Sequence, residues 1–508
     1  MHRLLTTFML STLAYVALAA TWAVASPLAS VPDEPAHMIR AAAVVRAQIV
    51  TEAWPSFPAW AGVIVPEYIA NTPQLTCFAF QPSVTPDCAP PGAVADDLRS
   101  PTSTGTSAAL NSPLFYYLVG WPTLFFTGEL ALYAMRFVNA LMFGALMGLA
   151  MTQLRRMRRA PRWSMVAFVA ATTPMALYLG GSVNPNGVEA AGTLALYLLV
   201  LSSLQQAPRG VWRTFSPIVI AATALLVVNS RSIGFLWVAI VILLAITQTG
   251  WRRFFNAIRT RWTTVTLALS AVMVVASLAW FTVLPEYDQS AILVNPTSPR
   301  LALMSAAFGV FDDGKGLIGF FGWLDTPAPE FSALAYGAAG LGFLLFSSGM
   351  TRGVDRWIPL AFASVIVIVP AAVQTIVADE LGYIWQGRYL LAMYMCFIVA
   401  SGLALDQQVT RRGADGLEST DRIARYLIFG LCVAQIVAFL HVMKRYVVGE
   451  DGTYDQMLTG PDWVPPGGWI PISVAFAIIV LACGYLANSV SRQARGVVVR
   501  SSAERTTD

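Results

Sequence analysis

Blocks of about twenty consecutive apolar residues recur along almost the whole chain, and this is the length at which a helix crosses a lipid bilayer. The chain has 508 residues, of which 56% are hydrophobic and only 12% are charged, with a mean hydropathy of +0.62. A soluble domain carries roughly 25% charged residues, so too few charges remain here to solvate a globule of this size. The sequence therefore predicts an all-α polytopic membrane protein.

The apolar blocks predict about twelve transmembrane helices in a single domain, residues 1–490. Two long outer loops, 26–111 and 285–330, interrupt the blocks, and a hydrophilic tail at 491–508 is expected to be disordered. The predicted spans are 4–25, 130–154, 163–181, 188–203, 214–228, 233–246, 264–284, 331–346, 358–377, 390–405, 423–442 and 470–487.

The basic residues between these spans predict the orientation of the chain. Stretches such as "RRMRRAPR", "WRRFFNAIRTR" and "SRQAR" all fall on one side when the N-terminus is placed inside, as the positive-inside rule requires. Both termini are then cytoplasmic in a multi-pass protein of the plasma membrane. The first block ends in "WAVAS", which resembles a signal-peptidase site, and a cleaved signal peptide is the alternative for 4–25. Nucleic-acid binding is not expected, because no basic domain stands apart from the membrane blocks.

Two amphipathic stretches in the first outer loop predict helices that lie on the membrane surface. "AHMIRAAAVVRAQIV", 36–50, has apolar residues at helical spacing and basic residues between them. "PLFYYLVGWPTLFF", 113–126, is too short and too interrupted by proline to span, and its aromatic residues suit the interface.

Five cysteines are present, and two of them share the first outer loop. Cys77 and Cys88 are expected to form a disulfide, because that loop faces an oxidising compartment. Cys396, Cys432 and Cys483 lie inside apolar blocks, where a thiol packs as a small apolar group.

Few charges lie within the spans, whereas ion-coupled transporters usually keep charged residues there. The polar residues gather instead where spans meet the outer loops, so a functional site is expected at the outer membrane face. Four stretches carry carboxylates, amides or a guanidinium at that face: "PDEPAH", "SVNPNGVE", "FDDGKGLIGFFGWLDTPAPE" and "GYIWQGRYLL".

These motifs and their order resemble the GT-C superfamily of membrane glycosyltransferases. More narrowly, "PDEPAH..R", "NPNG", "GFFGWLDTPAPE" and "QGRYLL" resemble a bacterial family of polytopic membrane proteins grouped with that superfamily. The resemblance implies an inverting glycosyltransferase of the bacterial inner membrane. It implies a polyprenyl-phosphate sugar as donor, an envelope glycan or glycolipid as acceptor, and an extracytoplasmic active site.

The resemblance also suggests roles for individual residues. Asp33 is the expected catalytic base by its position in the first-loop motif, and Glu34 either shares that role or binds a divalent ion such as Mg²⁺, Mn²⁺ or Ca²⁺. Arg388 presents a planar charged fork that suits the donor phosphate. Arg136 and Lys315 are the other expected phosphate ligands, and the expected substrate-binding residues are His37, Arg40, Asn184, Asn186, Glu189, Trp323, Asp325, Gln386 and Tyr389.

Each of these residues also has a purely structural alternative. Asp33 and Glu34 are suited to capping a helix, and the arginines to anchoring at the headgroups, which is the preferred reading for Arg231. "NPNG" is also a common turn sequence, and its lack of a carboxylate weakens any two-carboxylate metal site. No cofactor is therefore assigned.

Two other functions stay open. A flippase or transporter of lipid-linked sugars explains the spans and the outer basic residues, and would need polar residues at mid-membrane depth. A non-catalytic partner in envelope assembly would need no cavity between the outer loops and the bilayer. The sequence does not identify the sugar, the acceptor or the oligomeric state.

Overall fold

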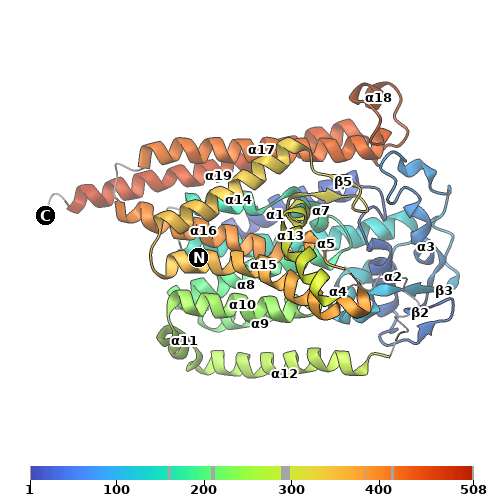
Figure 1. The fold of residues 1–508 in the computed structure, drawn as a ribbon, viewed down its shortest axis with the longest axis horizontal. Coiled ribbons are helices and arrows are strands. Elements are labelled where there is room, and N and C mark those ends of the chain that lie inside the picture. The colour runs from blue at the N-terminus through green and yellow to red at the C-terminus, as the bar shows by residue number, and fades with distance from the viewer. Residues whose placement is uncertain are drawn as a thin grey trace.

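Most long helices of the computed structural model run roughly parallel to one another, and a smaller part made of strands and short helices covers one end of them (Figure 1). The structure describes residues 2–157, 162–206, 212–285, 287, 298–382, 384–412 and 417–505. Within these residues, nine helices are long and apolar enough to cross a membrane, or up to eleven if each bent pair counts as one span. An all-α polytopic membrane architecture is therefore confirmed.

The elements fall into three groups. The long helices are α1 (His2–Ala25), α5 (Gly128–Met157), α8 (Pro185–Gln205), α9 (Trp212–Val228), α10 (Gly234–Thr249), α12 (Arg261–Val283), α13 (Pro299–Ile318), α14 (Glu330–Met350), α15 (Val354–Leu381), α16 (Leu391–Arg412), α17 (Leu417–Val448) and α19 (Trp469–Arg505). The short helices are α2 (Glu34–Val44), α3 (Glu67–Ala70), α4 (Pro113–Gly120), α6 (Trp163–Ala171), α7 (Pro174–Gly180), α11 (Trp251–Ile258) and α18 (Tyr454–Thr459). The strands are β1 (Ala53–Trp54), β2 (Phe57–Pro66), β3 (Pro101–Thr106), β4 (Phe320–Phe321) and β5 (Thr326–Pro327).

Every predicted span coincides with a helix or a bent helix pair, and the nine to eleven candidate spans among the described residues compare with about twelve predicted. The pair α6 and α7 bends by 57°, where Pro174 cannot continue the preceding helix. The pair α10 and α11 bends by 111° at Gly250, whose φ of 94° is readily available only to glycine. The apolar part of α9, Phe215–Val228, falls below the length of a full span.

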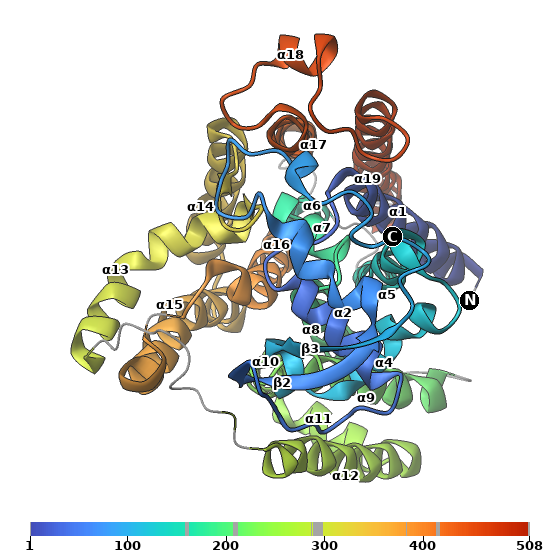
Figure 2. The same cartoon turned by 90° about the vertical axis from the view of Figure 1, so that its right-hand side faces the viewer.

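The first outer segment contains a small sheet that the sequence patterns did not predict. It has the order β1-β2-β3, and β2 pairs antiparallel with β3 from Ala61 opposite Thr106 to Pro66 opposite Pro101. This sheet and α2 lie together at the end of the molecule that faces the viewer in Figure 2. Cys77 and Cys88 are paired in the same segment, with their Cα atoms 6.1 Å apart.

The stretch 36–50, predicted to be a helix on the membrane surface, is packed against other parts of the protein. The helix there, α2, begins at Glu34 and ends at Val44, and almost all of its side chains are buried. Thr106 of β3 donates a 2.7 Å hydrogen bond to the carbonyl oxygen of Ala36, so the sheet lies directly against the helix. The small side chains that gave the amphipathic pattern allow close packing against protein instead of lipid. The second interfacial segment is helical as predicted, with α4 followed by a 3₁₀ turn at Trp121–Leu124.

The second outer segment, 285–330, is not only a loop, because most of its described part is α13. Near its end, Gly316 packs against the "QGRY" segment so closely that a Cβ atom there would lie 3.0 Å from the Cα of Gly387. At the other end of the chain α19 continues to Arg505, where a disordered tail was expected.

The centre of the bundle is formed by α8 and α16. In the most apolar 18-residue stretch of each helix, 89% and 94% of the residues are buried. On one side of them, α1 packs against α5 through a G-x-x-x-G pair, Gly144 and Gly148. A Cβ atom on Gly148 would lie 2.9 Å from the backbone nitrogen of Thr12. This contact holds the first helix against the rest of the protein.

A fully buried ion pair joins these elements at the end of the bundle that carries the strands. Arg136 of α5 donates from Nε and Nη2 to the two carboxylate oxygens of Glu34, at 2.8 and 2.6 Å. It also donates to the carbonyl oxygens of Ala23, Ser26 and Pro27, which follow or end α1. Glu34 Oε1 accepts a further 2.9 Å bond from the backbone N–H of Val183, just before α8.

We expect Glu34→Gln to lower the free energy of unfolding by about 3–5 kcal/mol, because it leaves the Arg136 guanidinium buried without its counter-charge. Arg136→Gln should have a similar effect, and the double variant should lose less than the sum of the two. The measurement is the thermal unfolding midpoint in detergent.

The matched control for this prediction is Glu129→Gln, which neutralises an exposed carboxylate at the start of α5. Equal midpoints for the Glu34 and Glu129 variants would contradict a structural role for the pair.

Candidate functional site

A cavity of about 160 Å³ lies at the end of the molecule that carries the strands. It is formed where α2, the turn after β3, the start of α8, the link between α9 and α10, and the start of α16 meet. Its lining residues are Asp33, His37, Ser107, Ala108, Asn111, Pro185, Asn186, Arg231 and Tyr389. Three of the four polar stretches singled out in the sequence contribute to it.

Asp33 is the carboxylate of this cavity, and its backbone is unusual. It precedes α2 with a φ of 67°, in the left-handed region that few non-glycine residues occupy, and its side chain makes no capping hydrogen bond. Its Oδ2 instead accepts a 2.7 Å bond from Nη2 of Arg388. The Asp33 side chain is 50% exposed, whereas that of Arg388 is 1% exposed. The helix-cap alternative therefore does not describe this carboxylate.

The charges around Asp33 keep it ionised. Burial raises the pKa of the carboxyl, but the positive charges of Arg388 and Arg231 and the hydrogen bond from Arg388 outweigh that effect, so the pKa lies below its ordinary value. A carboxylate of this kind is available as an anion throughout the physiological pH range.

Arg388 lies in the 3₁₀ turn Gly387–Leu390, behind Asp33 as seen from the cavity. Its Nε and Nη1 are buried and have no hydrogen-bond partner within the described residues. Its guanidinium carbon is 5.4 Å from the ring centre of Tyr389, which does line the cavity. The Arg388 guanidinium thus donates one hydrogen bond to Asp33 and keeps further N–H donors that no described residue accepts.

Arg231 is the arginine that lines the cavity, although its sequence context suggested only an outer-edge anchor. It lies 4.0 Å over the ring of Tyr389, and its Nη1 donates to Oδ1 of Asn186. Burial alone would lower the pKa of Arg231. The neighbouring Tyr389, Glu189 and Asp33 have the opposite and larger effect, so the pKa lies above its ordinary value and the side chain stays charged. The signal in the sequence was "NSRS", a basic residue between two apolar blocks on the outer side, as in "QGRY".

The "NPNG" motif starts α8 rather than forming only a turn. Asn184 is the N-cap and accepts a 3.0 Å bond from the backbone N–H of Asn186, and Pro185 occupies the first turn, where its missing N–H is not needed. Gly187 is required because a Cβ atom there would lie 2.8 Å from the backbone of Leu179. The positive end of the α8 dipole therefore faces the cavity, which favours an anion.

His37 is bound to the cavity wall through tyrosine and asparagine. Its Nδ1 is 2.9 Å from the hydroxyl of Tyr116, and that hydroxyl accepts a 3.1 Å bond from Nδ2 of Asn111. Burial lowers the pKa of His37 to about 4, and the charges of Arg231 and Arg388 act in the same direction while Asp33 opposes them. The imidazole is therefore neutral at pH 7.

The structure separates Glu34 and Arg136 from the cavity, although both were expected at the site. Both side chains are 0% exposed, and every oxygen of the carboxylate and every nitrogen of the guanidinium has a partner in the pair described above. Neither group has capacity left for a substrate. This arrangement is that of a structural ion pair.

The remaining expected residues lie around the cavity rather than in it. Arg40 is fully buried beside the rings of Tyr116 and Trp280, at 6.0 and 5.8 Å, with its Nε and Nη2 unpartnered in the described structure. Glu189 is buried in the first turns of α8, and its charge acts on Arg231. Gln386 is half-buried, with an Oε1 that accepts no bond from a described residue.

Residues of the "GWLDTPAPE" and "GKG" stretches are held by other partners. Trp323 donates a 3.0 Å bond from Nε1 to the carbonyl of Ala29, and Asp325 forms a 3.3 Å ion pair with Arg445. Lys315 is exposed on α13, one residue before the glycine that packs against Gly387. These residues support the loops that carry the site, and none of them lines the cavity.

The donor set does not suit a divalent cation. Within the described ranges no three His, Cys, Asp or Glu side chains gather closely enough to hold a metal ion. At the cavity Asp33 is bonded to a guanidinium, and the nearest candidate ligand, His37, is bonded to Tyr116. Mg²⁺ and Ca²⁺ prefer several oxygen ligands, so no role for such an ion follows from these residues.

The low pKa of His37 predicts a pH dependence of stability. The unfolded chain binds a proton at His37 with its ordinary pKa of 6.5, but the native chain does so only near pH 4. Stability contributed by the neutral imidazole is therefore present above pH 6.5 and is lost as the pH falls toward 4. We expect the thermal unfolding midpoint of His37→Gln to fall less steeply than that of the wild type as the pH is lowered from 6.5 to 4.5. Parallel curves for the variant and the wild type would contradict the buried, neutral imidazole.

Comparison with solved structures gives two matches to one protein. The chain is similar to ArnT from Cupriavidus metallidurans bound to undecaprenyl phosphate, with 12% identity and a TM-score of 0.45 over 97% of this chain and 78% of that chain. The apo form of the same ArnT matches with 13% identity and a TM-score of 0.43, over 94% and 75% of the two chains. No curated protein matches the sequence.

A family model gives the firmer result. The model described as a predicted membrane protein, DUF2142, matches residues 16–397. That range contains every residue that lines the cavity, together with Arg388. Because the match spans well over half of the sequence, the chain belongs to the DUF2142 family of predicted membrane proteins.

Proposed function

We propose that this protein is an inverting glycosyltransferase of the GT-C type, which moves a sugar from a polyprenyl-phosphate donor to an envelope glycan or glycolipid. The observation that carries the proposal is the pairing of a half-exposed, ionised Asp33 with the buried Arg388 at a cavity that a second arginine, Arg231, also lines. A carboxylate and one guanidinium group line this cavity, and a second guanidinium group is bonded to the carboxylate.

This pairing suits transfer from a glycosyl phosphate. The acceptor hydroxyl gives its proton to the Asp33 carboxylate while its oxygen bonds to the anomeric carbon. The bond between that carbon and the phosphate oxygen breaks, and its electron pair leaves with the polyprenyl phosphate. The leaving group is already an anion, so it needs positive charge rather than a general acid. Attack from the face opposite to the phosphate inverts the anomeric carbon.

The two arginines would divide the work. Arg231 and the N-terminus of α8 would bind the donor phosphate, because both face the cavity and both favour an anion. Arg388 would orient Asp33 and lower its pKa, and its unpartnered donors would add positive charge close to the phosphate. His37 and Asn111, which line the cavity and are held in place by the buried hydroxyl of Tyr116, would offer uncharged hydrogen-bonding groups to sugar hydroxyls.

The proposed orientation places this cavity outside the cell. Arg155 and Arg156 end α5 at the opposite end of the bundle from Arg136 and the cavity, so the positive-inside rule makes that opposite end cytoplasmic. The polyprenyl-phosphate sugar would then reach the site from the outer leaflet.

The test uses purified protein in detergent with labelled polyprenyl-phosphate sugars and membranes of the source cell as acceptor. We expect Asp33→Asn to lower the transfer rate by roughly 10²–10⁴ while binding of polyprenyl phosphate persists. We expect Arg231→Gln to weaken that binding and to lower the rate by roughly 10²–10³.

Asp451→Asn is the control, because this exposed carboxylate accepts a bond from Ser83 and does not line the cavity. Near-normal transfer by Asp33→Asn would overturn the assignment of the base. Movement of labelled lipid across liposomes without any transfer of sugar would instead identify the flippase alternative.

A further inference from the structure

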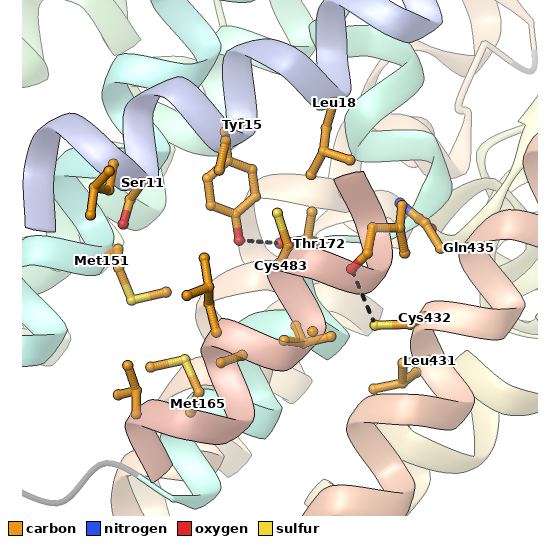
Figure 3. Close-up of a pocket in the computed structure, with 18 of the residues that line it drawn as sticks. Ser11, Tyr15, Leu18, Met151, Met165, Thr172, Leu431, Cys432, Gln435 and Cys483 are labelled. Atoms are coloured by element: carbon orange, nitrogen blue, oxygen red, sulfur yellow. Dashed lines mark hydrogen bonds between the residues drawn. The ribbon is translucent and has the colours of Figure 1, made fainter. Parts of the chain in front are cut away.

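A second cavity, of about 290 Å³, lies between α1 and α19, and its lining residues include none of those around Asp33 (Figure 3). The two helices meet near the outer side, where the rings of Trp22 and Phe476 are 6.0 Å apart. The cavity begins beside Leu18 of α1 and Val480 of α19 and extends from there toward the start of α1 and the end of α19. Residues of α6 and α17 form its floor. The residues of α1 in Figure 3, Ser11, Tyr15 and Leu18, point into this space.

The groove is long and narrow. On α1 the lining runs from Thr6 to Leu18, which is about 18 Å of helix, and on α19 it runs from Val480 to Val490, which is about 15 Å. One leaflet contributes about half of the roughly 30 Å hydrocarbon core. The groove therefore extends over the depth of a single leaflet, as a lipid acyl chain does.

The chemistry of the walls suits an alkyl chain. The polar groups at the closed end satisfy one another: Tyr15 and Thr172 share a 3.3 Å hydrogen bond, and Tyr336 donates a 3.1 Å bond to Gln435. Most other lining side chains are aliphatic or sulfur-containing, such as Met151, Met165 and Leu431. At the mouth, Leu10 and Leu486 are 59% and 54% exposed, so the groove opens toward the surrounding lipid.

The basic end of the groove carries an unpaired cation. Arg155 lines the cavity, is half-buried, and forms no hydrogen bond or ion pair with a residue in the described part of the chain. Its neighbour Arg156 differs, because it donates a 3.0 Å bond to the carbonyl oxygen of Gln206. Arg155 is near the end of α5, at the level where lipid phosphates lie when the bundle spans a bilayer.

We propose that this groove binds one anionic phospholipid of the leaflet on the basic side of the protein. One acyl chain would lie between α1 and α19, and the phosphate would pair with Arg155. The length of the groove, its apolar walls and the placement of the free guanidinium all fit this occupant. The site is separate from the Asp33 cavity, so the proposal does not depend on the proposed transferase activity.

The test is native mass spectrometry of the full chain released from nanodiscs that contain phosphatidylglycerol and phosphatidylethanolamine in equal amounts. We expect the wild type to retain one phosphatidylglycerol. Arg155→Gln should retain the two lipids equally, and Ala14→Phe, which fills the groove, should lower retention at least tenfold. The matched controls are Arg156→Gln and Leu13→Phe, because Leu13 is 66% exposed on α1 and does not line the groove.

A second readout uses the native protein. Cys483 lines the groove and is half-buried, so phosphatidylglycerol should slow its alkylation by a small maleimide severalfold. Equal retention in Ala14→Phe and Leu13→Phe, or unchanged alkylation of Cys483, would overturn the proposal. Displacement of phosphatidylglycerol by equimolar undecaprenyl phosphate would overturn the choice of phospholipid as the occupant.

Discussion

The ion pair between Glu34 and Arg136 fixes the geometry of the end of the molecule that carries the strands and the Asp33 cavity. Removing two charges from water is costly, and the cost is offset only when nearly every donor and acceptor is satisfied. Here the guanidinium bonds to Glu34 and to three carbonyl oxygens near the end of α1. The carboxylate also accepts the backbone N–H of Val183. The pair thereby joins three segments: residues 23–34, Arg136 of α5, and Val183 before α8. In the sequence, Asp33 directly precedes Glu34, and Asn184 directly follows Val183.

The electrostatics of the cavity follow from this placement. Asp33 has a φ of 67°, and its side chain bonds to Arg388 instead of capping α2. Such a backbone conformation costs on the order of 1 kcal/mol, and it is maintained where the surroundings enforce it. The result is one carboxylate held as an anion beside two guanidinium groups, with a neutral histidine on the same wall. An excess of positive charge next to a base is the arrangement that transfer from a phosphate donor requires.

The sequence predicted the membrane architecture well, because length and hydropathy of the blocks follow directly from the thickness of a bilayer. It predicted less of the first outer segment. The β2 sequence, "FPAWAGVIVP", contains proline and glycine and lacks a clear alternation, so a strand was not evident. Two neighbouring carboxylates, Asp33 and Glu34, were given similar roles, although one is half exposed and the other is fully buried. Only the backbone turn between them separates these environments, and no residue pattern encodes it.

The arginines show the same limit. Arg231 and Arg388 both follow an apolar block, and the resemblance of "QGRYLL" to a family motif favoured Arg388 as the phosphate ligand. The structure places Arg231 on the cavity and Arg388 behind Asp33.

The most direct measurement is an experimental map of the protein with polyprenyl phosphate bound. The account predicts phosphate oxygens within about 3 Å of the Arg231 guanidinium, with the Asp33 carboxylate open to the same space. A phosphate bound elsewhere, with the cavity still closed around Arg231 and Asn186, would contradict it.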